Sequence, residues 1–231
     1  MEIRKEDILE RYTDQAPSYD RSRFGSFGGN YMHEMEINIL RRFMKQGSVL
    51  ELGVGTGRCS LVLAKAGHNV VGIDITRKML EVAKIKMKQV GIEFEVVNMD
   101  AEMLGFRESF DNVICFYTFH FLSRPLVTLK NCYHVLRPSG RCIVSFENRN
   151  FWNITFNRYD VIPKNLYTPR EVEQLFRIAG FIVIGRRKIF HAPYRFYRKA
   201  PKFLLKPIIK VDQKKEGWLI AIVAGEKRRS L

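Results

Sequence analysis

The chain has 231 residues, a length that predicts a single domain, residues 1–231, with a sizeable core. Hydrophobic residues make up 46% of the sequence, but no apolar run approaches the ~20 residues that span a bilayer, and the charged start of the chain lacks the apolar core of a signal peptide. The formal net charge is +15, so the composition excludes a transmembrane segment and a secretory leader, and it leaves a strongly basic protein that we expect in the cytoplasm.

The first part of the chain, residues 1–45, is predicted to form a helical lid. Residues 5–16 place apolar side chains at helical spacing among charges, which predicts a short amphipathic helix. Residues 17–29 are rich in serine, glycine and aromatic residues and predict a loop. A second helix is expected over residues 31–45, and Gly47 is expected to end it.

Residues 46–146 alternate short apolar runs with helical segments, which is typical of an α/β protein with a parallel sheet. Strands are predicted at residues 48–52, 69–73, 92–98, 111–116 and 141–146. Helices are predicted at residues 58–66, at residues 76–89 with Thr76 as the N-cap, and at residues 124–136.

Residues 147–231 are expected to supply a substrate-side segment and the closing strands. Residues 148–167 have no clear period, whereas the Thr168-Pro-Arg-Glu171 capping box predicts a helix that ends before Gly180. Two further strands are predicted at residues 181–190 and 218–224. The segment between them, residues 191–217, is longer than a tight hairpin needs.

The four cysteines form no Cys-x-x-Cys pair and stand in apolar contexts. We therefore predict that they are small core residues in a reducing compartment, and we expect no metal site. They are Cys59, Cys115, Cys132 and Cys142.

The first predicted strand runs straight into a glycine-rich turn. Gly53, Gly55 and Gly57 stand at alternate positions, and a glycine lets backbone lie against a ligand because it has no Cβ atom. The second predicted strand ends at Asp74, a carboxylate that can accept two hydrogen bonds from a ribose diol. A strand, a glycine turn, a helix and an acid-tipped strand are the layout of a nucleotide-binding βαβ unit, although such a turn also occurs as a plain tight turn.

The spacing differs from that of a dinucleotide site, where a third glycine would stand at position 58 in place of Arg58. In addition, Glu51 precedes the first glycine by two residues. A pyrophosphate gains nothing from a neighbouring carboxylate, whereas a ligand with an amino-acid ammonium group does. The segment Glu51-Leu-Gly-Val-Gly-Thr-Gly57 therefore resembles motif I of the class I S-adenosylmethionine (SAM) methyltransferases.

The resemblance extends over roughly residues 8–190. Residues 98–102 resemble the segment whose acid binds the adenine amino group, residues 110–116 the fourth strand, and residues 135–141 the turn before the fifth strand. Residues 16–20, Ala-Pro-Ser-Tyr-Asp, resemble an N-terminal element of the small-molecule branch, which includes quinone-biosynthesis enzymes. The resemblance implies a Rossmann-like α/β fold: a seven-stranded, mostly parallel sheet with helices on both faces and a C-terminal antiparallel hairpin.

The resemblance also implies a SAM site at the carboxyl ends of the strands, where open α/β sheets bind ligands. The glycines would approach the methionine part, Glu51 would help bind the ammonium through water, and Asp74 would bind the ribose. Ile75, Met79 and Phe116 would flank or underlie the donor, and core packing is the alternative for these three. The implied cofactor-binding residues are Tyr19, Arg23, Glu51, Gly53, Gly55, Gly57, Asp74, Ile75, Met79, Asp100, Ala101 and Phe116.

His120 follows the fourth predicted strand and is the candidate catalytic base for an oxygen or nitrogen nucleophile. Its alternative roles are to cap the next helix or to form a hydrogen bond within the core. Tyr12, Tyr117 and Trp152 are the candidate substrate contacts, because aromatic residues in both flanking segments favour an apolar or ring-bearing acceptor.

Motifs of the base-methylating enzymes are absent: residues 115–118 read Cys-Phe-Tyr-Thr, and the sequence holds no Pro-Cys pair. We therefore expect a small-molecule acceptor of aromatic, lipid or quinone-like character. The alternatives are an RNA or protein methyltransferase that uses the basic stretch at residues 186–210, and a non-catalytic SAM-binding scaffold. That stretch is a candidate contact for an anionic membrane surface or RNA, or it is a solvated basic face.

Overall fold

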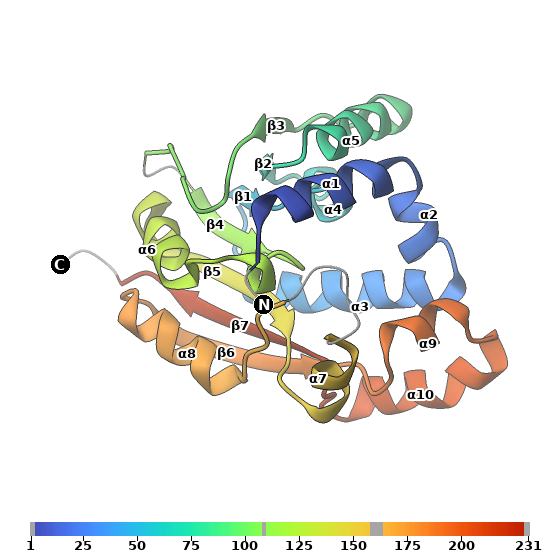
Figure 1. Cartoon of the computed structure of the whole chain (residues 1–231). Helices are drawn as coiled ribbons and strands as arrows, with labels where there is room; N and C mark the ends of the chain where they lie inside the picture. Colours follow the sequence, from blue (N-terminus) through green and yellow to red (C-terminus); the bar gives the residue numbers. More distant parts are fainter. Residues whose placement is uncertain (1–2, 108–109, 158–163, 229–231) are drawn as a thin grey trace.

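The computed structural model describes residues 3–107, 110–157 and 164–228 (Figure 1). A seven-stranded sheet with the order β3-β2-β1-β4-β5-β7-β6 runs through the molecule. Its first five strands are parallel, and β7 lies antiparallel between β5 and β6. This arrangement confirms the predicted fold. The strands are β1 (Ser48–Leu52), β2 (Asn69–Asp74), β3 (Glu95–Asn98), β4 (Phe110–Cys115), β5 (Leu136–Glu147), β6 (Ile182–Ile189) and β7 (Ile220–Glu226).

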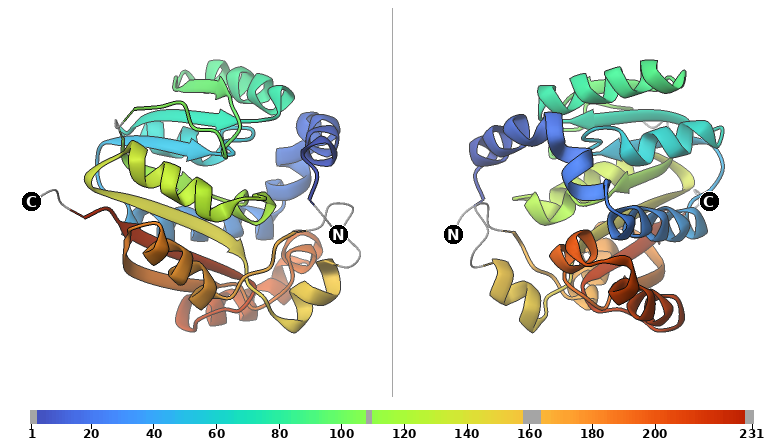
Figure 2. Two further views of the ribbon diagram at one scale, coloured as in Figure 1. Left: turned by 60° about the vertical axis from the view of Figure 1, so that its left-hand side comes forward. Right: turned by 90° about the vertical axis from the view of Figure 1, so that its right-hand side faces the viewer.

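The inner strands are covered on both faces, which is why they read as unbroken apolar runs. In β1, Leu50 and Leu52 point into one core and Val49 into the other, and all three are fully buried. The helices α6 (Pro125–Val135) and α8 (Pro169–Ile178) cover the first face, as the left view of Figure 2 shows. The helices α3 (Phe27–Phe43) and α4 (Arg58–Lys65) cover the second face.

A helix packs on β2 and β3, and a second helix packs on it. α5 (Arg77–Val90) follows β2, and α1 (Lys5–Gln15) packs beside it, as Figure 1 shows. As predicted, Thr168 and Glu171 form a capping box at the start of α8. Thr76 stands at the N-cap position of α5, but its side chain makes no capping hydrogen bond.

The expected loop at residues 17–29 is helical. It contains a short 3₁₀ turn at Ala16–Ser18, then α2 (Tyr19–Phe24), and α3 already begins at Phe27. The glycines misled the prediction because glycine is a poor helix former. Here Gly28 allows close packing, since a Cβ atom at this position would lie 1.9 Å from the backbone oxygen of Tyr197.

Three more helices lie in segments for which the sequence predicted no helix or strand. They are α7 (Phe151–Asn157), α9 (Tyr194–Lys199) and α10 (Lys202–Lys214). Tertiary contacts hold the last two: the buried Asp212 of α10 accepts hydrogen bonds from Tyr197 Oη at 2.6 Å and from His191 N at 3.0 Å. The two helices and these contacts make up most of the long connection between β6 and β7.

Two strands begin three or more residues away from the predicted position, and the other strand limits lie within two residues of the prediction. β3 begins at Glu95 rather than at residue 92, and β5 begins at Leu136 rather than at residue 141. The early start of β5 accompanies a register shift between Phe110 and Asn112 of its neighbour β4. The four cysteines are free and buried. Among the described helices, none combines the length and the apolar character needed to cross a membrane.

Candidate active site

The turn after β1 exposes bare backbone to a cavity. Gly53, Gly55 and Gly57 all have positive φ angles, 71°, 55° and 75°. A Cβ atom at Gly53 would lie 1.9 Å from Thr118 Oγ1, and one at Gly57 would lie 2.8 Å from Phe94 Cζ, whereas no atom lies within 4 Å of the Cβ position at Gly55. Gly53 and Gly57 are therefore needed for close packing, and Gly55 leaves open space beside the backbone.

Asp74, at the end of β2, forms hydrogen bonds with the backbone of this turn and of residue Thr76. Its Oδ2 accepts a hydrogen bond from Gly55 N and its Oδ1 from Thr76 N, each at 2.8 Å. Burial raises the pKa of the Asp74 carboxyl above its usual value, against the opposing effect of these two donors. Each carboxylate oxygen can accept more than one hydrogen bond, so Asp74 keeps acceptor capacity toward the cavity.

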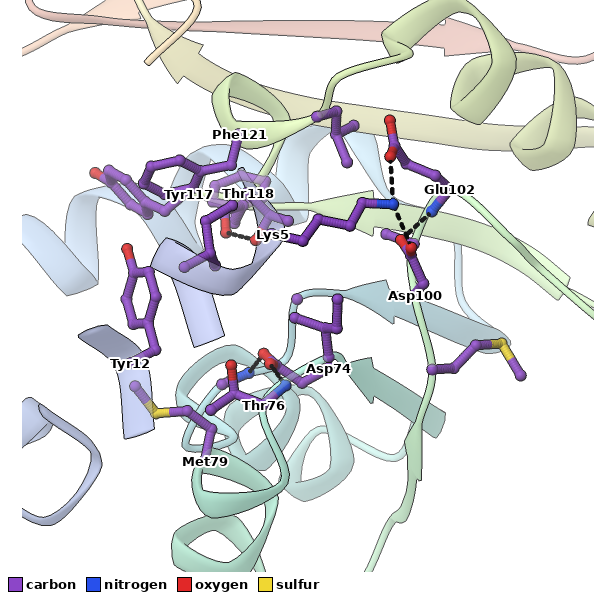
Figure 3. Close-up of a pocket in the computed structure, with 18 of the residues that line it drawn as sticks. Lys5, Tyr12, Asp74, Thr76, Met79, Asp100, Glu102, Tyr117, Thr118 and Phe121 are labelled. Atoms are coloured by element: carbon purple, nitrogen blue, oxygen red, sulfur yellow. Dashed lines mark hydrogen bonds and ion pairs between the residues drawn. The ribbon is translucent and has the colours of Figure 1, made fainter. Parts of the chain in front are cut away.

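A first cavity of about 120 Å³ lies at this edge of the sheet, between the strand ends and α1 (Figure 3). Residues from α1 and from the segments after β1, β2, β3 and β4 meet there, although they are far apart in the sequence. The expected donor-binding residues that line it are Tyr19, Gly53, Gly55, Asp74, Ile75, Met79, Asp100, Ala101 and Phe116, and the expected substrate residues are Tyr12 and Tyr117.

Three expected donor-binding residues do not line this first cavity. Gly57 packs against Phe94, and Arg23 lines a neighbouring cavity. Glu51 is buried within β1, where it accepts a hydrogen bond from Ser60 Oγ at 2.5 Å. Burial raises the pKa of the Glu51 carboxyl to about 7.

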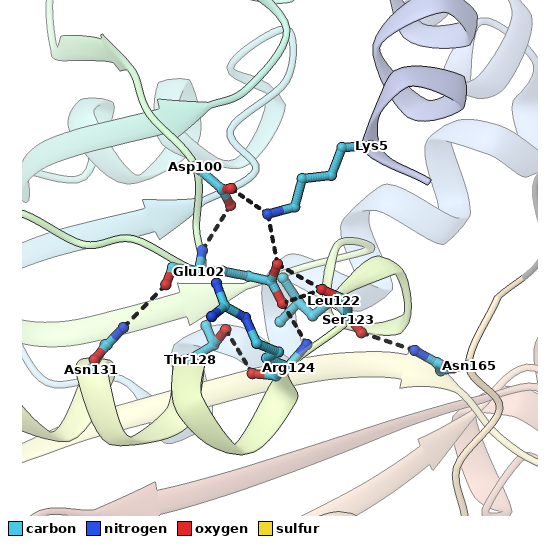
Figure 4. A network of polar contacts seen from close by, with 9 residues as sticks. All are labelled: Lys5, Asp100, Glu102, Leu122, Ser123, Arg124, Thr128, Asn131 and Asn165. Atoms are coloured by element: carbon cyan, nitrogen blue, oxygen red, sulfur yellow. Dashed lines mark hydrogen bonds and ion pairs between the residues drawn. The ribbon is translucent and has the colours of Figure 1, made fainter. Parts of the chain in front are cut away.

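Lys5 lines the first cavity and reaches from α1 to the segment after β3, as Figure 4 shows for the contact. Its Nζ lies 2.5 Å from Asp100 Oδ2 and 2.8 Å from Glu102 Oε2. The Glu102 carboxylate is buried and also accepts a hydrogen bond from Ser123 Oγ at 2.9 Å. Sequence reasoning missed Lys5 and Glu102, because nothing local to the charged N-terminus indicates that it folds back onto residues 100–102.

A second cavity of about 400 Å³ adjoins the first. Four aromatic residues line both cavities: Tyr12, Tyr19, Tyr117 and Phe121. The two cavities therefore share an aromatic wall.

His120 lines the second cavity, in a 3₁₀ turn at Phe119–Phe121 that follows β4. The imidazole is buried, and its Nδ1 has no hydrogen-bond partner among the described residues. Burial, with smaller effects from the positive charges of Lys164 and Arg23, holds the pKa of His120 well below its usual value. The ring is therefore neutral, and it does not cap α6, whose N-cap residue is Arg124.

Tyr117 is held in the shared wall by a buried polar network. It has a positive φ angle of 57°, which is uncommon for a bulky residue, and its hydroxyl donates a hydrogen bond to Glu36. Tyr194 donates in turn to the Tyr117 hydroxyl, and Arg58 pairs with Glu36 at 3.0 Å. Arg58, which replaces the third glycine of a dinucleotide site, therefore balances a buried carboxylate.

Trp152 is placed differently from the sequence expectation. It lies in α7, is 49% exposed and stacks on Trp218 with ring centroids 6.5 Å apart. It is not among the residues that line either cavity. An unassigned aromatic residue, Tyr194, lines the second cavity instead. It lies in α9, within the long connection between β6 and β7 for which the sequence predicted no element.

The chain is similar in sequence to known methyltransferases. A family model described as a methyltransferase domain matches residues 50–144. The ubiquinone biosynthesis O-methyltransferase of Coxiella burnetii is 32% identical over 165 residues, which are 66% of this chain and 70% of that protein. The protein of the same name from Ralstonia nicotianae is 35% identical over 124 residues, 50% of this chain, and the chain spans about half, 52%, of its length.

Among solved structures, a SAM-dependent methyltransferase of Thermotoga maritima, described as a possible histamine N-methyltransferase, is similar with a TM-score of 0.74. The match covers 96% of this chain and 100% of that chain, at 21% identity. At this identity the likeness concerns the fold.

Proposed function

This chain belongs to the class I SAM-dependent methyltransferases, and on that premise we propose that it transfers a methyl group to a hydroxyl oxygen of a small, ring-bearing acceptor. The observation that carries the proposal is the aromatic wall shared by the two cavities, because it sets a donor cavity directly beside an acceptor cavity. The names of the curated relatives, which are O-methyltransferases, support an oxygen as the acceptor atom.

The residues of the first cavity fit a SAM donor. The space beside Gly55 is open, and Asp74 presents acceptor oxygens at the end of β2 where a ribose diol can donate to them. When bound, SAM supplies a methyl group on a positively charged sulfur. Met79 and Ile75 add an apolar surface for a flat ring, and Asp100 adds an acceptor for an amino group.

The second cavity fits the acceptor. Tyr12, Tyr19 and Phe121 supply ring surfaces that can orient an aromatic molecule and exclude water from it. We propose that His120, which is neutral and lines this cavity, takes the proton from the acceptor hydroxyl. Alignment of the reacting groups supplies the larger part of the acceleration, because the donor is intrinsically reactive.

We propose that residues 1–45 act as a lid within the single domain. α1 supplies Lys5, Ile8 and Tyr12 to the first cavity, so the donor cannot be enclosed until this helix is seated. A lid that carries cavity residues would keep water away from the reacting groups.

The proposal is tested by incubating the protein with methyl-labelled SAM and a panel of catechols, hydroxybenzoates and hydroquinones. We expect label in the O-methyl product, and Asp74→Asn should weaken donor binding by roughly ten- to a hundredfold, because an amide cannot accept from both backbone donors. Asp14→Asn, at an exposed site in α1, is the matched control. Label that enters only RNA or protein, or donor binding without any transfer, would contradict the proposal and favour the alternative functions.

We also propose that α10 contacts an anionic membrane surface in the cytoplasm. Its exposed face mixes apolar and basic residues, as interfacial helices do. The support comes from Phe203, 69% exposed, and Leu204, 46% exposed, beside the exposed Lys202, Lys206 and Lys210. Flotation with vesicles that contain anionic lipid should retain the protein, and equal recovery with neutral vesicles would contradict the contact.

A further inference from the structure

The part of the second cavity formed by α2 and α9 is lined by arginines, and we propose that it is a subsite for a negatively charged group of the acceptor. Arg23 comes from α2, and Arg195 and Arg198 come from α9. The inference rests on the proposed function, because it names the class of acceptor: a ring compound that carries a carboxylate or a phosphate-type oxyanion.

The charge balance of the second cavity favours an anion. Among the described residues, the lining also includes the cations Arg11 and Lys164 and one carboxylate, Glu147. Glu147 is already paired with Lys164 at 2.8 Å. Within the described part of the chain, no ion pair joins Arg195 or Arg198 to a carboxylate.

Arg198 is the group that most needs such a partner. Its Nε is buried and has no hydrogen-bond partner among the residues that the structure describes. Burial lowers the pKa of Arg198, and the positive charges of Arg23 and Arg195 lower it further. A partly buried cation that faces like charges is unfavourable, and an oxyanion among the three guanidinium groups would both satisfy the donor and offset the repulsion.

The arrangement also suits the geometry of an oxyanion. Arg195 and Arg198 are three residues apart on α9, so they lie on neighbouring positions of one helix face. A guanidinium presents its N–H groups as a planar fork that matches a carboxylate or phosphate. Arg23 lies with its Cζ 5.1 Å from the ring centroid of Tyr19, a residue that lines both cavities.

These contacts would set the orientation of the acceptor in the second cavity. An anion held by the arginines would lie on the side of Tyr19 that belongs to the second cavity, and the ring attached to it would extend along Tyr19 and Tyr117 toward the first cavity. The arginines would thus select the acceptor and aim its hydroxyl, whereas the donor cavity would be unaffected.

The test measures binding rather than turnover. The full chain is saturated with S-adenosylhomocysteine and titrated by calorimetry with 3,4-dihydroxybenzoate, 3,4-dihydroxyphenylphosphonate and the neutral 3,4-dihydroxybenzamide. At low salt we expect at least one anionic probe to bind about tenfold tighter than the amide, as a charge-assisted contact would give. The relative affinities of the carboxylate and phosphonate identify which oxyanion the subsite prefers.

Variants test whether the arginines of α9 cause the preference for charged probes. The double variant R195Q/R198Q should bring the charged probes within about threefold of the amide, whereas K199Q, at an exposed position of the same helix, should keep the preference. Unchanged affinity for S-adenosylhomocysteine shows that the double variant is folded. If it does not fold, a preference in the wild-type protein that falls steeply with added salt still supports the subsite.

Equal affinity for the charged and neutral probes, failure of all three to bind, or a preference that survives R195Q/R198Q would overturn the inference. Its failure is distinguishable from that of the proposed function. Charge-selective binding without methyl transfer would support the subsite and contradict the transferase proposal, and transfer to neutral acceptors without charge selection would do the reverse.

Discussion

The ammonium of Lys5 lies 2.5 Å from Asp100 Oδ2, and these two residues are 95 positions apart in the sequence. The contact joins the first helix to the segment after β3 (Figure 4), and both residues line the first cavity. Glu102 shares the same ammonium at 2.8 Å, so a single cation lies between two carboxylates. One side chain therefore links α1, which belongs to the proposed lid, to the proposed adenine end of the donor site.

We expect Lys5→Met to weaken binding of S-adenosylhomocysteine by about two- to fivefold, because the ion pair is partly exposed and holds the lid by roughly 0.5–1 kcal/mol. The rate at which S-adenosylhomocysteine dissociates should rise by a similar factor, because the lost ion pair would make it easier for the lid to open. Calorimetry and stopped-flow fluorescence measure the two quantities. Lys84→Gln, at an exposed site on α5, is the control, and an unchanged dissociation rate in Lys5→Met would contradict the link.

The buried Glu51 should make stability depend on pH. Burial raises its pKa from 4.5 to about 7 in the folded protein, so the folded state binds this proton more tightly than the unfolded chain does. The Glu51 contribution to the free energy of unfolding is therefore largest below pH 4.5 and falls as the pH rises toward 7. Urea unfolding at several pH values measures the free energy of unfolding of the wild type and of the Glu51→Gln variant.

Relative to Glu51→Gln, the wild type should lose roughly 3 kcal/mol of unfolding free energy between about pH 4.5 and pH 7, which corresponds to the shift of the pKa. A difference between the two proteins that stays constant over this range would rule out the raised pKa. If the variant also loses donor affinity, the expected role of Glu51 toward the donor's ammonium gains support.

His120→Gln tests the proposed base. We expect kcat to fall by about a hundredfold, because general-base assistance is lost, while donor affinity stays within about twofold of the wild type. His134→Gln changes an exposed histidine and should leave both quantities unaltered. A fall in donor affinity with normal kcat would show instead that the imidazole is a structural element of the cavity.

Tyr117→Phe tests the buried network. Removing the hydroxyl leaves the buried Glu36 without this donor, so we expect a loss of about 1–3 kcal/mol of unfolding free energy. Urea unfolding measures the change. Tyr133→Phe, which keeps its ring contact with Phe181, is the matched control and should cost less. Equal stability of the two variants would mean that Glu36 is satisfied by Arg58 alone.

Parts of the site could be predicted from local sequence. The glycines at positions 53 and 55 and the acid at position 74 have recognisable spacing because a tight turn and a strand end constrain only nearby residues. The structure places all three in one cavity. The position of Trp152 could not be predicted in this way. In a segment without periodicity, the sequence does not indicate which surface an aromatic side chain faces.

The sequence by itself determined the α/β alternation, the glycine turn and the acid at the end of β2, because burial on both faces of a sheet and the steric needs of a turn act over a few residues. Only the tertiary structure decided the helical course of residues 16–29, the reach of Lys5 to Asp100 and the meeting of Arg23 with α9. Those features depend on contacts between segments that are distant along the chain, where neither propensity nor periodicity carries information.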